Sequence, residues 1–199
     1  MGAGQLAEEV RDSDPPRALN VRAFFGLPLP DEQRDELGRY LEECTRRAPQ
    51  FRWTPAANLH LTVRFLGHLE VAVAEEIADR LTGADLPGFE LALGEVGAFK
   101  RGRLARVVWL GLRSGEKESG ALAAAVEAEC QRAGLEGEAR AYHPHLTLAR
   151  ARPRDGTALP ELPDAPRTAG WRAAELILYR SRLGRAGSVY EPLRSIKLR

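Results

Sequence analysis

His60-Leu61-Thr62-Val63 and His145-Leu146-Thr147-Leu148 are the same four-residue pattern, written twice in a chain of 199 residues. In an extended strand, side chains two positions apart project from the same face. Each copy therefore places a histidine and a threonine on one face and two aliphatic side chains on the other. Random placement of four His and seven Thr would give about 0.14 His-x-Thr matches. Either copy alone could be a buried strand with a satisfied polar pair, but the duplication favours a functional site.

The composition is that of an ordinary globular protein large enough to bury a sizeable core, as one domain or two small lobes. Hydrophobic residues make up 44% and charged residues 29%. The net charge of +1 argues against a broad surface that coats duplex nucleic acid, although a short or single-stranded polyanion remains possible. Cys44 and Cys130 form no Cys-x-x-Cys pair and are expected to be reduced core residues.

The first 17 residues are acidic and end in consecutive prolines, which predicts a disordered leader over 1–17 and one folded, bilobal domain over 18–199. No segment has the length and apolar character of a membrane span, and none has the pattern of a signal sequence. We therefore expect a cytoplasmic monomer that makes no contact with membranes.

Hydrophobic periodicity and turn residues indicate a mixed order of strands and helices. The two motif strands fall in similar surroundings of strands and a helix. This favours an internal duplication and an α+β fold: two pseudo-symmetric lobes, each an antiparallel sheet with helices on its outer face, enclosing a central groove. Predicted helices cover 31–48, 70–82 and 116–133; predicted strands cover 18–27, 59–66, 89–93, 106–112, 145–149, 171–179 and 188–198, with a short strand near 52–54.

The duplicated pattern suits chemistry at a phosphodiester. Displacement at phosphorus needs a base for the attacking oxygen and an acid for the departing one, roughly in line. Histidine can hold either role at neutral pH, and a threonine hydroxyl can donate to the non-bridging oxygens. No metal or other cofactor is required by this scheme. The residues alone do not say which histidine is the acid.

Several motifs together resemble one family. They are Arg52-Trp53-Thr54-Pro55, Asn58 to Gly67, Val96-Gly97-Ala98-Phe99, Pro144 to Arg150, and Leu178-Tyr179-Arg180-Ser181. In this order, over about residues 18–198, they resemble the two-histidine phosphoesterases, and most closely the bacterial RNA 2′,3′-cyclic phosphodiesterases, also called 2′–5′ RNA ligases for the reverse reaction.

The resemblance implies hydrolysis of RNA 2′,3′-cyclic phosphate ends, or of small cyclic nucleotides, to 2′-phosphomonoesters. It makes His60 the proton donor and His145 the proton acceptor, with Thr62 and Thr147 holding the phosphate. Arg150 matches an arginine that follows the second motif in the family.

Strand parity distinguishes the two candidate arginines. Arg64 has the parity of His60 and Thr62, so a regular strand predicts it on their face. Arg150 has the opposite parity to Thr147 and needs a β-bulge to reach the substrate side. Both are taken as candidate substrate-binding residues.

Other features of the sequence have simpler explanations than a role in the site. His143 and His145 lack the third ligand that a zinc site needs, so no metal site is predicted. Four aromatic residues could stack a base but are more typical of a core: Phe25, Trp53, Phe65 and Tyr190. The basic turn at 100–103 is expected to be a solvated hairpin tip, and the proline-rich loop over 151–170 is expected either to cover a site or to be mobile.

Two alternatives to RNA-end hydrolysis stay open. One is a two-histidine phosphodiesterase for another substrate, such as a different cyclic nucleotide or a 2′–5′ oligonucleotide. The other is a module that binds RNA ends without catalysis.

Overall fold

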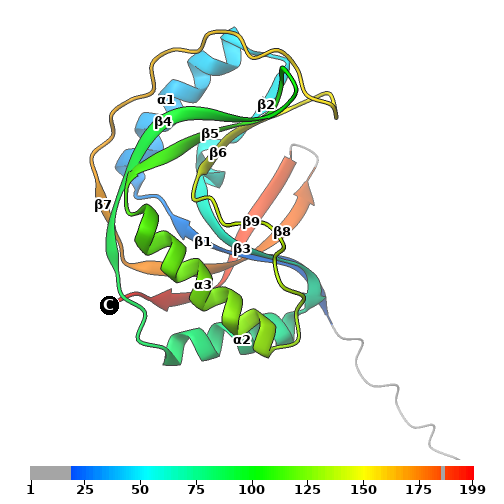
Figure 1. Cartoon of the computed structure of the whole chain (residues 1–199), viewed down its shortest axis with the longest axis vertical. Helices are drawn as coiled ribbons and strands as arrows, with labels where there is room; N and C mark the ends of the chain where they lie inside the picture. Colours follow the sequence, from blue (N-terminus) through cyan, green and yellow to red (C-terminus); the bar gives the residue numbers. More distant parts are fainter. Residues whose placement is uncertain (1–18, 185–186) are drawn as a thin grey trace, which may run out of the picture.

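The computed structural model describes residues 19–184 and 187–199, and the predicted leader over 1–17 lies outside them. One strand path contains most of the sheet, in the order β7-β4-β5-β6-β3-β1-β8-β9, with β2 paired to β6. All these pairings are antiparallel (Figure 1). The strands are β1 Asn20–Pro28, β2 Phe51–Trp53, β3 His60–Glu70, β4 Phe89–Arg101, β5 Leu104–Ser114, β6 Leu146–Ala151, β7 Trp171–Ala173, β8 Glu175–Gly184 and β9 Gly187–Lys197.

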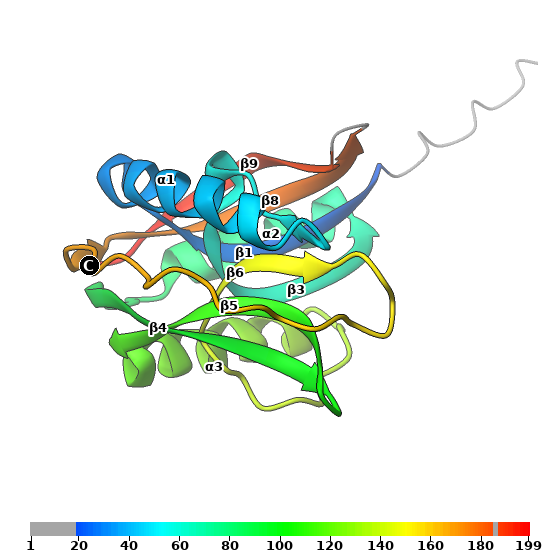
Figure 2. The same cartoon turned by 90° about the horizontal axis from the view of Figure 1, so that it is seen from above.

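In the part of the chain that the structure describes, three α-helices cover the sheet, in the positions that the apolar periodicity predicts. They are α1 Asp31–Arg47, α2 Val71–Gly83 and α3 Glu116–Arg132, and a short 3-10 turn, η1 Ala56–Asn58, precedes β3. Helix α1 begins with acidic residues and ends with Arg46 and Arg47, which suits the helix dipole. Seen from above, α1 and α3 lie on opposite sides of the strands (Figure 2).

The α+β class with helices outside an antiparallel sheet is confirmed, and the relation between the two halves is now defined. One half contains β1, β3, β8 and β9, and the other contains β2, β4, β5, β6 and β7. They join through a single residue pair between the motif strands, Leu61 opposite Leu146. The motif strands are therefore neighbours in one strand path, whereas the sequence predicted two sheets facing each other across a groove.

The aliphatic residues of both motifs lie in the core, as their alternation predicts. Leu61, Leu146 and Leu148 have no exposed surface, and Val63 is 4% exposed. Burying four such side chains contributes about 1.5–3 kcal/mol each to the free energy of folding. This burial fixes the register of both strands, because a slip by one residue would expose the aliphatic side chains.

The predicted strand over 171–179 is two strands, β7 and β8, separated at Ala174. They belong to different parts of the sheet, because β7 pairs with β4 and β8 pairs with β1. The hairpin of β4 and β5 is longer than predicted, and its tip at Gly102 is the basic turn. Among the described residues, no helix combines the length and the apolar character that a membrane-spanning helix needs.

The proline-rich loop after β6 runs along the outside of the molecule, past α1 and β4 (Figure 1). Hydrogen bonds hold it there: the Tyr40 hydroxyl donates to Pro163 O, and the Gln50 amide donates to Ala158 O. With β4 and Arg113 the loop borders a cavity of about 1000 Å³. None of the residues that line this cavity belongs to either motif, so this cavity is separate from the two motif histidines.

Candidate active site

The register of β3 and β6 brings both motifs to one point. Because Leu61 lies opposite Leu146 in an antiparallel pair, the same register sets His60 beside Thr147 and Thr62 beside His145. Exchanging the two strands leaves this arrangement unchanged, so a pseudo-twofold axis passes between the two leucines. We call the side of the sheet that carries these two His and two Thr the histidine face.

Each catalytic candidate is oriented by the same backbone hydrogen bond. The Nδ1 of His60 lies 2.8 Å from Asn58 O, and the Nδ1 of His145 lies 2.7 Å from His143 O. A carbonyl oxygen can only accept, so Nδ1 carries the proton and donates in both rings. In a neutral ring, Nε2 is then the nitrogen free to exchange a proton. For His60, the Thr62 hydroxyl donates to this nitrogen over 3.0 Å.

Aromatic rings surround His60. The ring centroid of Phe24 lies 4.7 Å from that of His60, and Tyr190 meets it edge-on at 5.1 Å. Tyr179 stacks on Phe24 at 5.1 Å. These residues come from β1, β8 and β9, so three strands fix the position of one imidazole.

A second aromatic cluster surrounds His145. Phe99 meets its ring edge-on at 5.0 Å, and Trp109 lies at 6.2 Å. His143 lies close to both, 5.1 Å from the Trp109 ring and 6.0 Å from the His145 ring. The two histidines therefore sit in separate aromatic settings, one in each half of the sheet.

Both imidazoles are harder to protonate than a free histidine. Burial lowers the pKa of His60 to about 4; the hydrogen bond to Asn58 O opposes this, and the nearby Arg150 and His145 lower the pKa further. Burial also lowers the pKa of His145, with His143 and Arg150 adding to the effect against the hydrogen bond to the His143 carbonyl. Near pH 7, both rings are therefore neutral in the free protein.

A β-bulge turns Arg150 to the histidine face, as strand parity requires. On β5, Val107 and Trp109 share a face; Trp109 pairs with Thr147, and Val107 pairs with Arg150. The extra residue on β6 is Leu148, which is fully buried. Arg150 therefore emerges on the side of Thr147, and its charge reaches both histidines.

A matching bulge turns Arg64 the other way, so its predicted place on the histidine face is wrong. Opposite β1, Thr62 pairs with Gly26 and Arg64 pairs with the fully buried Phe25, leaving Val63 as the extra residue. The Arg64 Nε donates to Glu127 Oε2 of α3 over 2.5 Å, and its side chain is 12% exposed. Arg64 therefore joins β3 to α3 on the outer side.

The other aromatic candidates divide between the two faces. Phe25 is fully buried in the core, and Trp53 packs near Phe51 and donates its Nε1 proton to Ala48 O. Phe65 is 46% exposed and lies against Phe24, on the histidine face, where Tyr190 also lies.

Several residues of the histidine face had no clear signal in the sequence. Trp109 and Phe24 lie in continuous apolar runs, where alternation between polar and apolar residues gives no information about the face. Tyr142 donates its hydroxyl proton to Thr62 O over 3.1 Å and so links the approach to the second motif with the first. Arg52 lies on β2 directly opposite Arg150. Within the described residues, no group of three or more His, Cys, Asp or Glu side chains is placed to hold a metal ion.

Comparison with known proteins identifies the family of this chain. The family model of the 2′-5′ RNA ligase superfamily matches residues 29–185. The RNA 2′,3′-cyclic phosphodiesterase of Escherichia coli (strain K12) is 34% identical over 176 residues, which cover 87% of this chain and 94% of the relative. The protein of the same name from Methanothermobacter thermautotrophicus is 30% identical over 188 residues, covering 90% of this chain and all of the relative.

A solved structure gives the same result for the fold. The crystal structure of E. coli LigT complexed with 3′-AMP matches with a TM-score of 0.76 at 28% identity, covering 90% of this chain and 99% of that chain. The resemblance of the motifs is thereby confirmed: the chain belongs to the 2′-5′ RNA ligase superfamily.

Proposed function

We propose that this protein hydrolyses RNA 2′,3′-cyclic phosphodiester ends to 2′-phosphomonoesters, with His60 as proton donor and His145 as proton acceptor. The observation that carries the proposal is the pairing of Leu61 with Leu146, which sets two oriented imidazoles and two threonines around one point. The relatives named RNA 2′,3′-cyclic phosphodiesterase support the choice of substrate.

The proposed reaction is a single displacement at phosphorus. The Nε2 of His145 accepts a proton from water, and the water oxygen forms a bond to phosphorus. The bond from phosphorus to the 3′ oxygen breaks, and the protonated Nε2 of His60 gives its proton to that oxygen. The phosphate stays on the 2′ oxygen. With an RNA 5′-hydroxyl in place of water, the same steps in the same direction would form a 2′–5′ linkage.

The remaining groups would stabilise charge on the phosphate. The hydroxyls of Thr62 and Thr147 would donate to the non-bridging oxygens, and the Arg150 guanidinium would offset their negative charge. Because the two imidazoles supply the acid and the base, the proposed mechanism uses no metal. Both motifs come from one chain, so we infer that a monomer contains the whole site, and we place the protein in the cytoplasm with its RNA substrates.

The function can be tested with a short RNA that ends in a 2′,3′-cyclic phosphate. We expect hydrolysis to a 2′-phosphomonoester, identified by ³¹P NMR, at a rate that excess EDTA leaves unchanged. An RNA ending in a linear 3′-phosphate serves as the control and should not react. Binding of the cyclic end without turnover, or formation of a 3′-phosphate, would contradict the proposal.

The pH dependence of kcat/KM follows from the two lowered pKa values. The reactive form has a proton on His60, with pKa about 4, and none on His145, whose pKa lies below its usual value. Above both pKa values the fraction with a protonated His60 falls tenfold per pH unit, so kcat/KM should fall about tenfold between pH 7 and 8. The optimum should lie below neutral pH. A flat profile from pH 6.5 to 8.5 would show that no group with a low pKa acts as the acid.

A further inference from the structure

Arginines gather beside the histidine face without carboxylate partners. Arg52 and Arg150 lie directly opposite each other on β2 and β6, and both are exposed. Side chains at such positions have Cβ atoms about 4.5–5.5 Å apart, and like charges there are destabilising. No ion pair is found for either residue within the described part of the chain, although many other arginines there have one. The fold thus keeps an uncompensated pair of cations next to the histidines.

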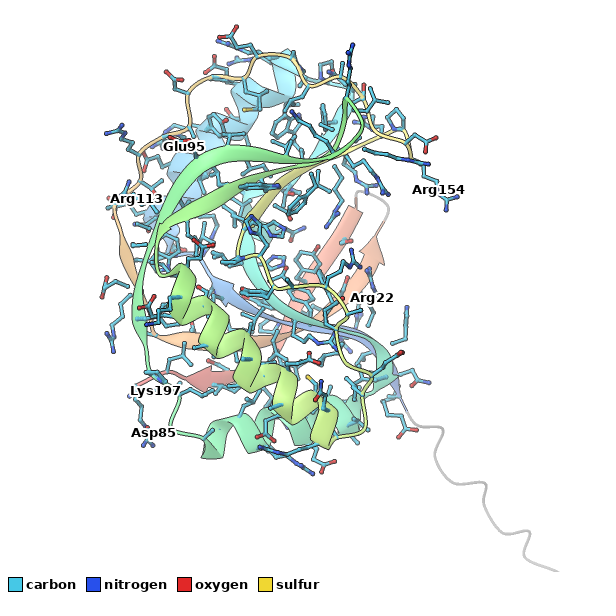
Figure 3. The ribbon with its side chains drawn as sticks, viewed as in Figure 1. Arg22, Asp85, Glu95, Arg113, Arg154 and Lys197 are labelled. Carbon is cyan, nitrogen blue, oxygen red and sulfur yellow. The ribbon has the colours of Figure 1, made fainter. Side chains whose placement is uncertain are left out.

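A third arginine approaches from the other half of the sheet. On β1, Arg22 alternates with Phe24 and so shares its face, which is the histidine face. Figure 3 shows Arg22 on the same side of the molecule as Arg154, which follows the end of β6. Arg22 is exposed and has no ion pair within the described residues.

The three charges act on one another. Partial burial of its guanidinium lowers the pKa of Arg150; Tyr190 opposes this, and the charges of Arg52 and Arg22 lower it further. Arg150 in turn lowers the pKa of His60 and His145. Arg150 thus lies on the face of Thr147 and directly opposite Arg52. An anion placed among the arginines would relieve their mutual repulsion.

We propose that Arg22 and Arg52, on the outer side of Arg150, form a second anion site, which holds the phosphodiester on the 5′ side of the terminal nucleotide. This inference rests on the proposed function, since it extends the same site along the RNA. The reacting cyclic phosphate then lies at the histidines and Arg150, and the next phosphate of the strand lies at Arg22 and Arg52. The enzyme would accordingly favour RNA of two or more nucleotides over a 2′,3′-cyclic mononucleotide, which lacks the second phosphate.

Two substrates with the same terminal base test this site: a 2′,3′-cyclic mononucleotide and a dinucleotide with a 2′,3′-cyclic end. We expect kcat/KM to be at least about tenfold higher for the dinucleotide. Replacing its internal phosphate with a neutral methylphosphonate should remove this preference. The change Arg52→Ala should lower kcat/KM for the dinucleotide about tenfold more than for the mononucleotide, and Arg22→Ala should act in the same direction. The salt dependence for the dinucleotide should also weaken in both variants.

Arg39→Ala is the matched control, because it removes the same charge from an exposed position on α1 and should leave the substrate ratio unchanged. If the wild-type protein turned over both substrates with a ratio that Arg52→Ala did not alter, the second anion site would be refuted while the proposed function stood. If neither substrate reacted, the proposed function would fail and this inference with it.

Discussion

Replacing either His60 or His145 with alanine is expected to lower kcat/KM for an RNA 2′,3′-cyclic phosphate by about 10²–10⁴-fold. The reason is that a backbone hydrogen bond at Nδ1 orients each ring and leaves its Nε2 as the nitrogen that exchanges a proton. The double variant should be little worse than the worse single variant, because an acid and a base that act in one step do not contribute independently. Steady-state rates with the dinucleotide substrate give these values.

The pH profiles of the two variants separate the roles. If His60 is the acid, residual activity of His60→Ala should lose the fall above neutral pH, while His145→Ala should keep it. His68→Ala is the matched control: this histidine is exposed on β3, opposite Arg22, and its loss should leave kcat/KM within about twofold. Thermal unfolding of each variant checks the fold. Activity near the wild-type level in either motif variant would refute the assignment, and an exchange of the two profiles would reverse the roles.

The sheet face of each side chain in the two motifs could be predicted because each motif alternates polar and aliphatic residues. The inward direction of Leu61, Val63, Leu146 and Leu148 follows from this alternation, and the structure has all four in the core. The helices could also be predicted from the sequence, since their apolar positions recur with helical spacing. The duplication was visible as well, although not the way in which the two strands meet.

The positions of the two arginines could not be decided from alternation. A β-bulge adds one residue to a strand and reverses the faces of all later side chains. The bulges at Val63 and Leu148 occupy equivalent places in the two motifs, so they send Arg64 to α3 and bring Arg150 to the histidine face. Arg64 therefore leaves the histidine face and Arg150 reaches it for the same physical reason, while the role of Arg150 in substrate binding stays a prediction. The sequence gives no sign of either bulge beyond the consecutive apolar residues that follow Thr147.

The sequence did not indicate the sheet face of residues that lie in entirely apolar runs. In the run from Val107 to Leu110, every residue is apolar, yet Val108 and Leu110 are buried in the core while Trp109 faces His145. A strand with two apolar faces does not reveal which side carries the site. The structure decides it through the pairing of Trp109 with Thr147.

Gly97→Ala is the second change with a large expected effect. Gly97 pairs with Trp109 across β4 and β5, and a Cβ at position 97 would fall inside the Trp109 indole. The residues before and after Gly97 are also paired with β5, which holds the backbone in place, so the indole must move. Because its ring lies against His143 and near His145, the change should displace the proton acceptor, for which about 10²-fold in kcat is a reasonable scale. Overpacking should also lower the free energy of unfolding by about 1–3 kcal/mol.

The double variant Gly97→Ala with Trp109→Val distinguishes displacement of the indole from damage to the hairpin. If the indole clash is the cause, removing the ring should restore much of the lost stability, as measured by urea unfolding, without restoring full kcat. Gly120→Ala is the matched glycine control: its Cβ would meet open space on α3, so it should raise stability by about 0.5–1 kcal/mol and leave kcat unchanged. Wild-type kcat in Gly97→Ala would mean that Trp109 does not position His145. Loss of stability that persists in the double variant would assign the role of Gly97 to the strand pairing itself.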